Sequence, residues 1–170
     1  MLVHKADEIV DRLTDAIHVT RSLARGLSPV DIEAGGIGVA LDGLARTARE
    51  VLGVECIVEL PDPVPELSLH VSTQLYRIAQ ECISNAAKHA RASRVHVSLT
   101  VLPEDLLQLR VANDGLPFRE SGSNGSGMGL HIMRYRAQSM EGMLEFELKP
   151  SHASTAVRCT IPFNTHTHTS

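Results

Sequence analysis

The chain of 170 residues contains no tryptophan, and aromatic residues make up only 3% of it, so its core must be built from aliphatic side chains. Basic runs interleaved with aromatics are missing and the net charge is −4, which argues against nucleic-acid binding. No uncharged apolar stretch reaches the roughly 18 residues needed to span a bilayer, and the N-terminus lacks signal-peptide features. We therefore expect a cytoplasmic globular domain, with no membrane contact by this segment.

Cysteine is also scarce, and its three positions lack the spacing of a metal site. Cys56 and Cys159 lie on apolar faces of predicted strands and Cys82 on the apolar face of a predicted helix, so all three are predicted to be core residues. His166 and His168 could hold a metal weakly, but a disordered polar tail over residues 164–170 is the better prediction.

Apolar residues near the N-terminus recur at intervals of four and three. They are Ile9, Leu13, Ala16, Leu23 and Leu27. This spacing predicts a helical arm over residues 1–28 that packs against other helices, and Gly26 and Pro29 end it. A domain follows over 29–163, with helices predicted at about 31–52, 70–90 and 129–140. Asp31 is a candidate N-cap of the first, although the glycines after it disfavour a regular start.

Apolar and polar residues alternate in five further segments, which predicts strands with one apolar face each. The apolar positions include Cys56 and Val58, Val95 and Val97, Leu107 and Leu109, Leu144 and Phe146, and Val157 and Cys159. Such strands form a sheet that is covered on one side only, and the three helices are available to cover it. The predicted fold is an α/β (α+β) two-layer sandwich of about five strands and three helices, preceded by the helical arm.

Strand parity points to a site between the two layers. Asn113 is in step with Leu109 and Val111, and Thr155 is in step with Val157, so both should point from strand ends toward the helices. A polar group aimed into that layer needs a partner, and a ligand held between the layers would supply one.

One predicted helix carries a polar stripe made of Glu81, Asn85, Lys88 and His89. Helical residues advance by about 100° each, so these four lie on one side, between the apolar arc and a water-facing side that includes Arg77 and Gln80. Acceptors, a cation and a proton carrier on such a border could bind a ligand at a partly buried surface. The border of any amphipathic helix would also look like this.

A glycine-rich segment leads from Asn113 into the last helix and ends in Gly127-Met128-Gly129. Glycines at a helix start let free N–H groups and the positive end of the helix dipole approach a phosphate closely. The segment is neither a dinucleotide-binding fingerprint nor a P-loop, because the required strand spacing and the Gly-Lys-Ser/Thr are missing. It suggests phosphate binding only in combination with the stripe.

Taken in order, these motifs resemble the ATP-binding catalytic domain of sensor histidine kinases, within the gyrase–Hsp90–kinase–MutL ATPase superfamily. Residues 80–90 (QECISNAAKHA) resemble the N-box, Asn113-Asp114-Gly115 the first glycine box, and Gly127-Met128-Gly129-Leu130 the second. Thr155 is similar to a late threonine near the adenine. The motifs NAAKHA at 85–90 and RGLSP at 25–29 resemble those of the nitrate/nitrite-sensor subfamily in particular. The resemblance implies a Bergerat-type fold with a mixed, mainly antiparallel sheet.

The resemblance also implies roles for these residues. Asn85 would coordinate Mg²⁺, Lys88 and His89 would contact the phosphates of ATP, and Glu81 would orient water or assist proton removal. Asn113, Gly115 and Thr155 would hold the adenine, and Asp114 would be counted with them among the nucleotide-binding residues. The glycine box from Gly127 to Leu130 would form the hinge of a lid and approach the phosphates.

Three features depart from the family pattern. Asn113 stands where the family usually has an aspartate, which predicts weaker adenine binding, and Pro117 replaces a glycine, which stiffens the lid. Neither His4 nor His18 is followed by the acidic residue expected after a phosphoacceptor histidine. The phosphoacceptor helix is therefore expected elsewhere, on a full-length kinase or a partner.

The leading hypothesis is a kinase domain that transfers the γ-phosphate of ATP to such a histidine and signals to a response regulator, in a homodimer formed through the arm. An alternative is a regulatory module resembling an anti-sigma-factor Ser/Thr kinase, or a non-catalytic ATP sensor. A nucleotide-free adaptor is the third possibility, against which Asn85, Gly127 and Gly129 argue.

Overall fold

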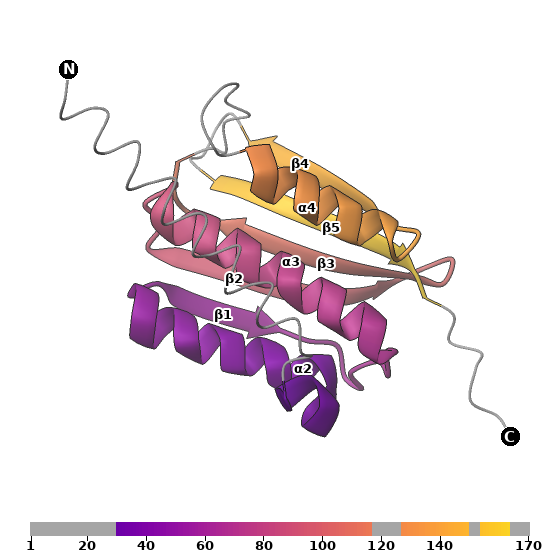
Figure 1. Cartoon of the computed structure of the whole chain (residues 1–170). Coiled ribbons are helices and arrows are strands. Elements are labelled where there is room, and N and C mark those ends of the chain that lie inside the picture. The colour runs from indigo at the N-terminus through magenta and orange to yellow at the C-terminus, as the bar shows by residue number, and fades with distance from the viewer. Residues whose placement is uncertain (1–29, 117–126, 150–153, 164–170) are drawn as a thin grey trace, which may run out of the picture.

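The computed structural model describes residues 30–116, 127–149 and 154–163. The predicted arm over 1–28, the glycine-rich segment at 117–126 and the tail over 164–170 lie outside the described residues. The described residues form two layers, a sheet and a set of helices on one of its faces (Figure 1). Among these residues, none of the helices combines the length and apolarity required to cross a bilayer.

The sheet has five strands in the order β1-β2-β3-β5-β4. Their bounds are Glu55–Glu59 (β1), Arg94–Leu102 (β2), Leu106–Asn113 (β3), Met143–Lys149 (β4) and Ser154–Pro162 (β5). β1 runs parallel to β2, and the other three pairings are antiparallel. The predicted mixed, mainly antiparallel sheet is therefore confirmed.

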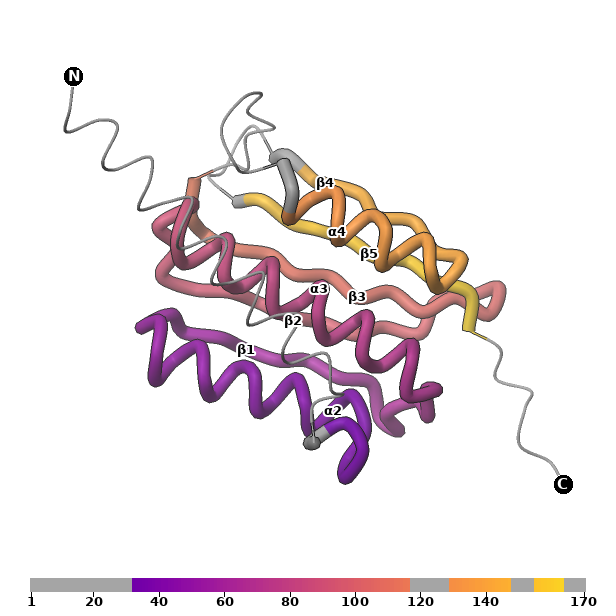
Figure 2. Tube along the Cα trace, in the orientation of Figure 1, coloured from indigo at the N-terminus to yellow at the C-terminus, as the bar shows by residue number. Residues whose placement is uncertain are grey.

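Three helices cover the sheet, and α3 lies between α2 and α4 in the chain trace (Figure 2). α2 (Val30–Thr47) continues into a π-helical turn, η1 (Ala48–Leu52). α3 spans Leu69–Lys88, and Ser68 caps it by accepting a hydrogen bond from the Val71 N–H at 3.3 Å. α4 spans Gly127–Gln138. The predicted helices are confirmed, with ends that differ by one or two residues.

The core between the layers is aliphatic, as the scarcity of aromatics required, and the three cysteines are buried in it. Burial raises the pKa of Cys56 to about 11 and that of Cys159 to about 12, so both thiols stay protonated near neutral pH. The Cys82 thiol lies 3.6 Å from the Met133 sulfur and joins α3 to α4. The cysteines are core residues, as predicted.

The opposite face of the sheet carries polar residues in cross-strand rows. Arg110 on β3 is the direct neighbour of Arg158 on β5, which places two cations side by side. Glu147 on β4 pairs with both, through distances of 3.1 Å to Arg110 Nη2 and 2.9 Å to Arg158 Nε. One carboxylate thus offsets the repulsion between two guanidinium groups.

The first turn of α2 is separated from the rest of the helix by a kink at Gly36, whose φ of 72° and ψ of −170° are not helical. The glycines expected to disturb the helix start do so at this residue. The helix begins at Val30, and the side chain of the proposed cap, Asp31, lies outside the described residues.

Replacing Gly36 with alanine should lower the free energy of unfolding by about 1–3 kcal/mol, because only glycine adopts this backbone conformation without strain. Gly53 is a matched control. Its φ of 67° and ψ of 21° are left-handed helical, which asparagine tolerates, so Gly53→Asn should change stability far less. Chemical denaturation of both variants measures the difference, and equal losses would contradict the assignment.

Candidate nucleotide-binding site

The strand ends bring the two predicted inward-pointing residues together. Asn113 and Thr155 are direct cross-strand partners in the β3–β5 register. Thr155 is only 3% exposed, and Asn113 is half-buried. The Asn113 amide oxygen accepts a hydrogen bond from the Gly115 N–H at 2.9 Å, and its amide nitrogen lies 3.5 Å from the Thr155 carbonyl. The predicted parity of both residues is confirmed.

The stripe on α3 follows the border between buried and exposed residues, as predicted. Glu81 and Asn85 are half-buried, while Lys88 and His89 at the end of the helix are exposed. His89 is the C-cap, and its N–H donates to the Asn85 carbonyl at 2.9 Å. The side-chain amide of Asn85 makes no hydrogen bond to any of the described residues. Its oxygen is therefore available to bind a ligand.

The start of α4 meets the stripe at Glu81. A Cβ added to Gly129 would collide with the Glu81 carboxylate oxygen, so that carboxylate lies directly against the backbone of the first turn of α4. Leu130, the next residue, is buried and anchors the turn in the core. Gly127 and Met128 begin the same helix. The structure therefore brings together the polar stripe and the second glycine box, which the sequence separates by about forty residues.

The stripe extends further along α3 than the sequence predicted. Arg77 was expected on the water side, but it is only 8% exposed, and its guanidinium donates to Gln80 at 3.0 Å. On the facing helix, Arg136 donates to Gln74 at 2.8 Å. Burial lowers the pKa of Arg136, and so does the nearby charge of Arg77, while Glu81 opposes the shift. The helical pattern did not reveal that α4 packs beside α3.

Asp114 has partners within the chain. Its carboxylate accepts hydrogen bonds from the backbone N–H groups of Ser93 and Arg94, both at 2.9 Å, and from the Ser93 hydroxyl at 2.5 Å. The Ser93 hydroxyl and the Arg94 N–H are the main causes that lower the pKa of this carboxyl. The carboxylate is thus bound to the start of β2, and the place of Asp114 among the nucleotide-binding residues stays a prediction.

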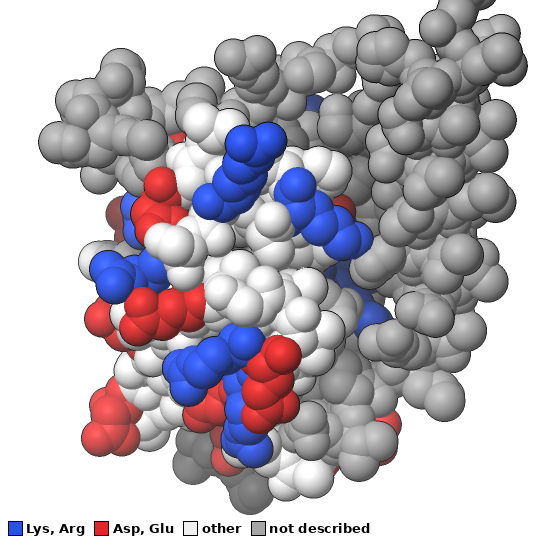
Figure 3. All heavy atoms as spheres, turned by 90° about the vertical axis from the view of Figure 1, so that its left-hand side faces the viewer, with Lys and Arg blue, Asp and Glu red and all other residues white. Residues whose placement is uncertain are grey.

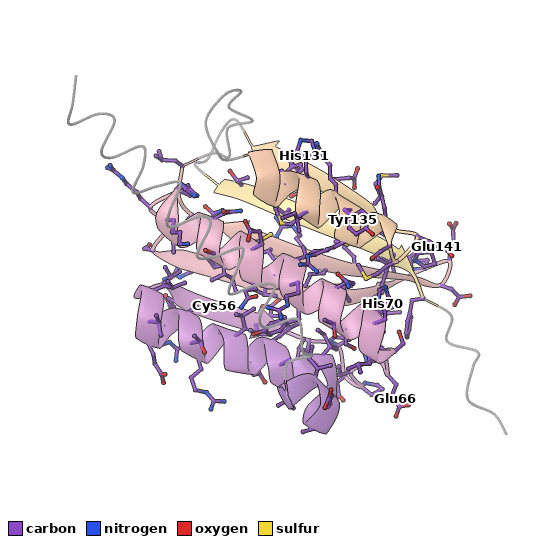
Figure 4. All side chains as sticks on the ribbon, viewed as in Figure 1. Cys56, Glu66, His70, His131, Tyr135 and Glu141 are labelled. Carbon is purple, nitrogen blue, oxygen red and sulfur yellow. The ribbon has the colours of Figure 1, made fainter. Side chains whose placement is uncertain are left out.

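The charges around the site are mixed in sign. Figure 3 faces the end of the molecule where α3 ends and β2 begins, and basic and acidic side chains alternate there. His131 and Tyr135 lie on the exposed side of α4 (Figure 4), outside the group of residues described above. The described residues contain no cluster of three His, Cys, Asp or Glu side chains suited to a metal. A single amide oxygen fits Mg²⁺, which takes its other ligands from phosphates and water.

Two glycines of the site differ in what surrounds them, which gives a prediction. A Cβ at Gly115 would collide with the Ala90 carbonyl in the backbone, whereas one at Gly129 would meet only the movable end of Glu81. Gly115→Ala should therefore lower the free energy of unfolding by about 1–3 kcal/mol, in the range of overpacking. Gly129→Ala should leave stability nearly unchanged and displace the Glu81 carboxylate. Thermal unfolding compares the two, and a more stable Gly115→Ala than Gly129→Ala would contradict this reading.

Residues 70–165 match the family described as histidine kinase-, DNA gyrase B- and HSP90-like ATPase. The chain is 30% identical to the sensor histidine kinase MctS of Rhizobium johnstonii, over 92% of this chain and 34% of MctS. It is 31% identical to the nitrate/nitrite sensor protein NarQ of Escherichia coli, over 69% of this chain and 20% of NarQ. The chain thus spans about a third of MctS and about a fifth of NarQ.

Solved structures share the fold. A histidine kinase domain of the blue-light-activated kinase EL346 from Erythrobacter litoralis superposes with a TM-score of 0.64 and 22% identity, covering 75% of this chain and 61% of that one. Full-length ShkA, crystallised in complex with AMPPNP, gives a TM-score of 0.61 and 22% identity over 82% of this chain and 32% of that one.

The ordered motifs and the sheet with its three helices agree with these comparisons, and the resemblance to the nitrate/nitrite-sensor subfamily is confirmed by the similarity to NarQ. The chain belongs to the histidine kinase-, DNA gyrase B- and HSP90-like ATPase family, as a catalytic ATP-binding domain of the sensor histidine kinase type.

Proposed function

We propose that the domain binds ATP with Mg²⁺ between α3, the start of α4 and the paired ends of β3 and β5. The observation that carries this proposal is the closeness of Glu81 to Gly129, because it joins the polar stripe to a helix start. In general, the N–H groups of a first helical turn lack partners within the helix and can bind phosphate. Asn113 and Thr155 then lie at the sheet end of the same layer. ShkA, which shares the fold, binds an ATP analogue.

Each residue has a defined part in this proposal. Asn85 would hold Mg²⁺ through its amide oxygen, and the metal would neutralise charge on the phosphate oxygens. Lys88 and His89, exposed at the end of α3, would contact the phosphates. Glu81 would orient water or take a proton beside the first turn of α4. Asn113, Gly115 and Thr155 would hold the adenine.

The phosphate acceptor would be a histidine on a helix outside this chain's site, belonging to the full-length kinase or to a partner. Such phosphoryl transfer needs positioning and charge neutralisation more than covalent chemistry by the protein. A response regulator would receive the phosphate next, in the cytoplasm. The seam over residues 1–28, which lies outside the described residues, would form a homodimer when its bundle is complete.

A regulatory ATP-sensing module, or a Ser/Thr kinase resembling anti-sigma-factor kinases, remains the alternative function. The two functions differ in the acceptor that the domain phosphorylates. Incubation with ATP and a histidine-bearing dimerisation helix of a related kinase should give an acid-labile, alkali-stable phosphoprotein if the leading proposal holds. Label on serine or threonine would support the alternative instead.

Asn85→Ala should abolish the Mg²⁺-dependent part of ATP binding while the fold is kept, because it removes the one proposed protein ligand to the metal. Calorimetric titration with ATP, with and without Mg²⁺, measures this loss. Ser84→Ala is the matched control, since Ser84 is the adjacent half-buried residue of α3. Unchanged affinity in Asn85→Ala would refute the metal role.

Asn113→Asp should tighten ATP binding several-fold, because a hydrogen bond to a charged acceptor is stronger than one to an amide by about 1 kcal/mol. The new carboxylate would still accept the hydrogen bond from the Gly115 N–H. It would have to shift slightly away from the Thr155 carbonyl oxygen, which lies 3.5 Å from the amide nitrogen of Asn113. Gln108→Glu makes the same change on the open face of β3 and should leave affinity unaltered. Weaker binding by Asn113→Asp would count against the adenine assignment.

A further inference from the structure

Asp114 occupies a junction between two loops at one end of the sheet. The first loop, residues 89–93, connects α3 to β2, and the second, residues 114–116, follows β3. β2 and β3 are antiparallel, with Val95 opposite Asn113, so the two loops lie next to each other. The first loop follows the exposed end of α3, and the second follows the strand end at Asn113.

Several hydrogen bonds join these two loops. The Asp114 carboxylate accepts from both N–H groups at the start of β2 and from the Ser93 hydroxyl, while the Asp114 N–H donates to the Arg94 carbonyl at 3.2 Å. One step further, the Leu116 N–H donates to the Ala90 carbonyl at 2.8 Å, and Gly115 lies against the same carbonyl with no space for a side chain.

These hydrogen bonds form a short connection between the two halves of the proposed site. Ala90 directly follows Lys88 and His89, the proposed phosphate contacts, and its N–H donates to the Asn85 carbonyl at 3.2 Å. Asn113 directly precedes Asp114. The junction therefore connects the base-binding residue to the metal-binding and phosphate-binding residues without involving the core of the sheet.

We propose that Asp114 is a positioning residue, which fixes the distance between the adenine-binding and phosphate-binding halves of the site before nucleotide arrives. This role gives a specific part to Asp114, which is predicted only as a member of the nucleotide-binding segment, and it rests on the proposed function. The geometry supports it because three donors converge on one carboxylate, and hydrogen bonds to a charged acceptor are the stronger kind. A site held in its binding geometry loses less entropy when ligand binds.

The test compares variants of Asp114 that keep or lose the acceptor oxygens. Asp114→Ala removes every acceptor and should weaken MgATP binding by about tenfold, from the loss of charge-assisted hydrogen bonds. Asp114→Asn keeps one oxygen, Oδ1, which serves both backbone N–H groups, and should restore most of the affinity. Asp42→Ala, on the exposed side of α2, is the control and should bind like the unmodified chain.

Calorimetry well below the unfolding temperature, with circular dichroism to establish that each variant is folded, separates positioning from general destabilisation. Hydrogen exchange at the Ser93 and Arg94 amides reports on the junction without nucleotide and should accelerate in Asp114→Ala. Folded Asp114→Ala with unchanged affinity and unchanged exchange would overturn the inference. If the unmodified chain binds no ATP, the proposed function fails, and the exchange measurement still tests the junction.

Discussion

The packing of α3 beside α4 over the apolar face of the sheet is the constraint on which the site depends. It places the Glu81 carboxylate against the backbone of α4 at Gly129, so that a side chain at position 129 would displace this carboxylate. The same packing places Cys82 against Met133. Arg77 is buried on α3, and its guanidinium donates to Gln80. The polar border of α3 thereby becomes a facing surface between two helices and is no longer simply the edge of an amphipathic helix.

Much of this arrangement could be predicted from the sequence. The period-two segments gave the five strands, and parity alone placed Asn113 and Thr155 on the inner face, where the register makes them direct partners. Helical spacing gave the border on which Glu81 and Asn85 lie. These predictions succeed because the direction of a side chain follows from backbone geometry within a single element.

The remaining features depend on contacts between elements, which local patterns do not contain. Arg77 has the spacing of a water-facing residue, yet it is buried and lies near Arg136 of α4. Asp114 stands in a motif that suggests a ligand, yet its carboxylate is directed to the start of β2. The pairing of β3 with β2 sets that direction. The motif therefore did not reveal the partners of the acidic residue within it.

The open face of the sheet has a consequence for how the molecule behaves at high concentration. β4 forms one edge of the sheet, and an unpaired edge can recruit a strand from another molecule. Alternation places Met143, Glu145 and Glu147 on the open face. Glu147 pairs with Arg158 on the adjoining β5 and with Arg110 on β3, one strand further. A second sheet stacking on the open face would have to desolvate this group of fixed charges, so the ion-pair row disfavours face-to-face stacking next to the edge.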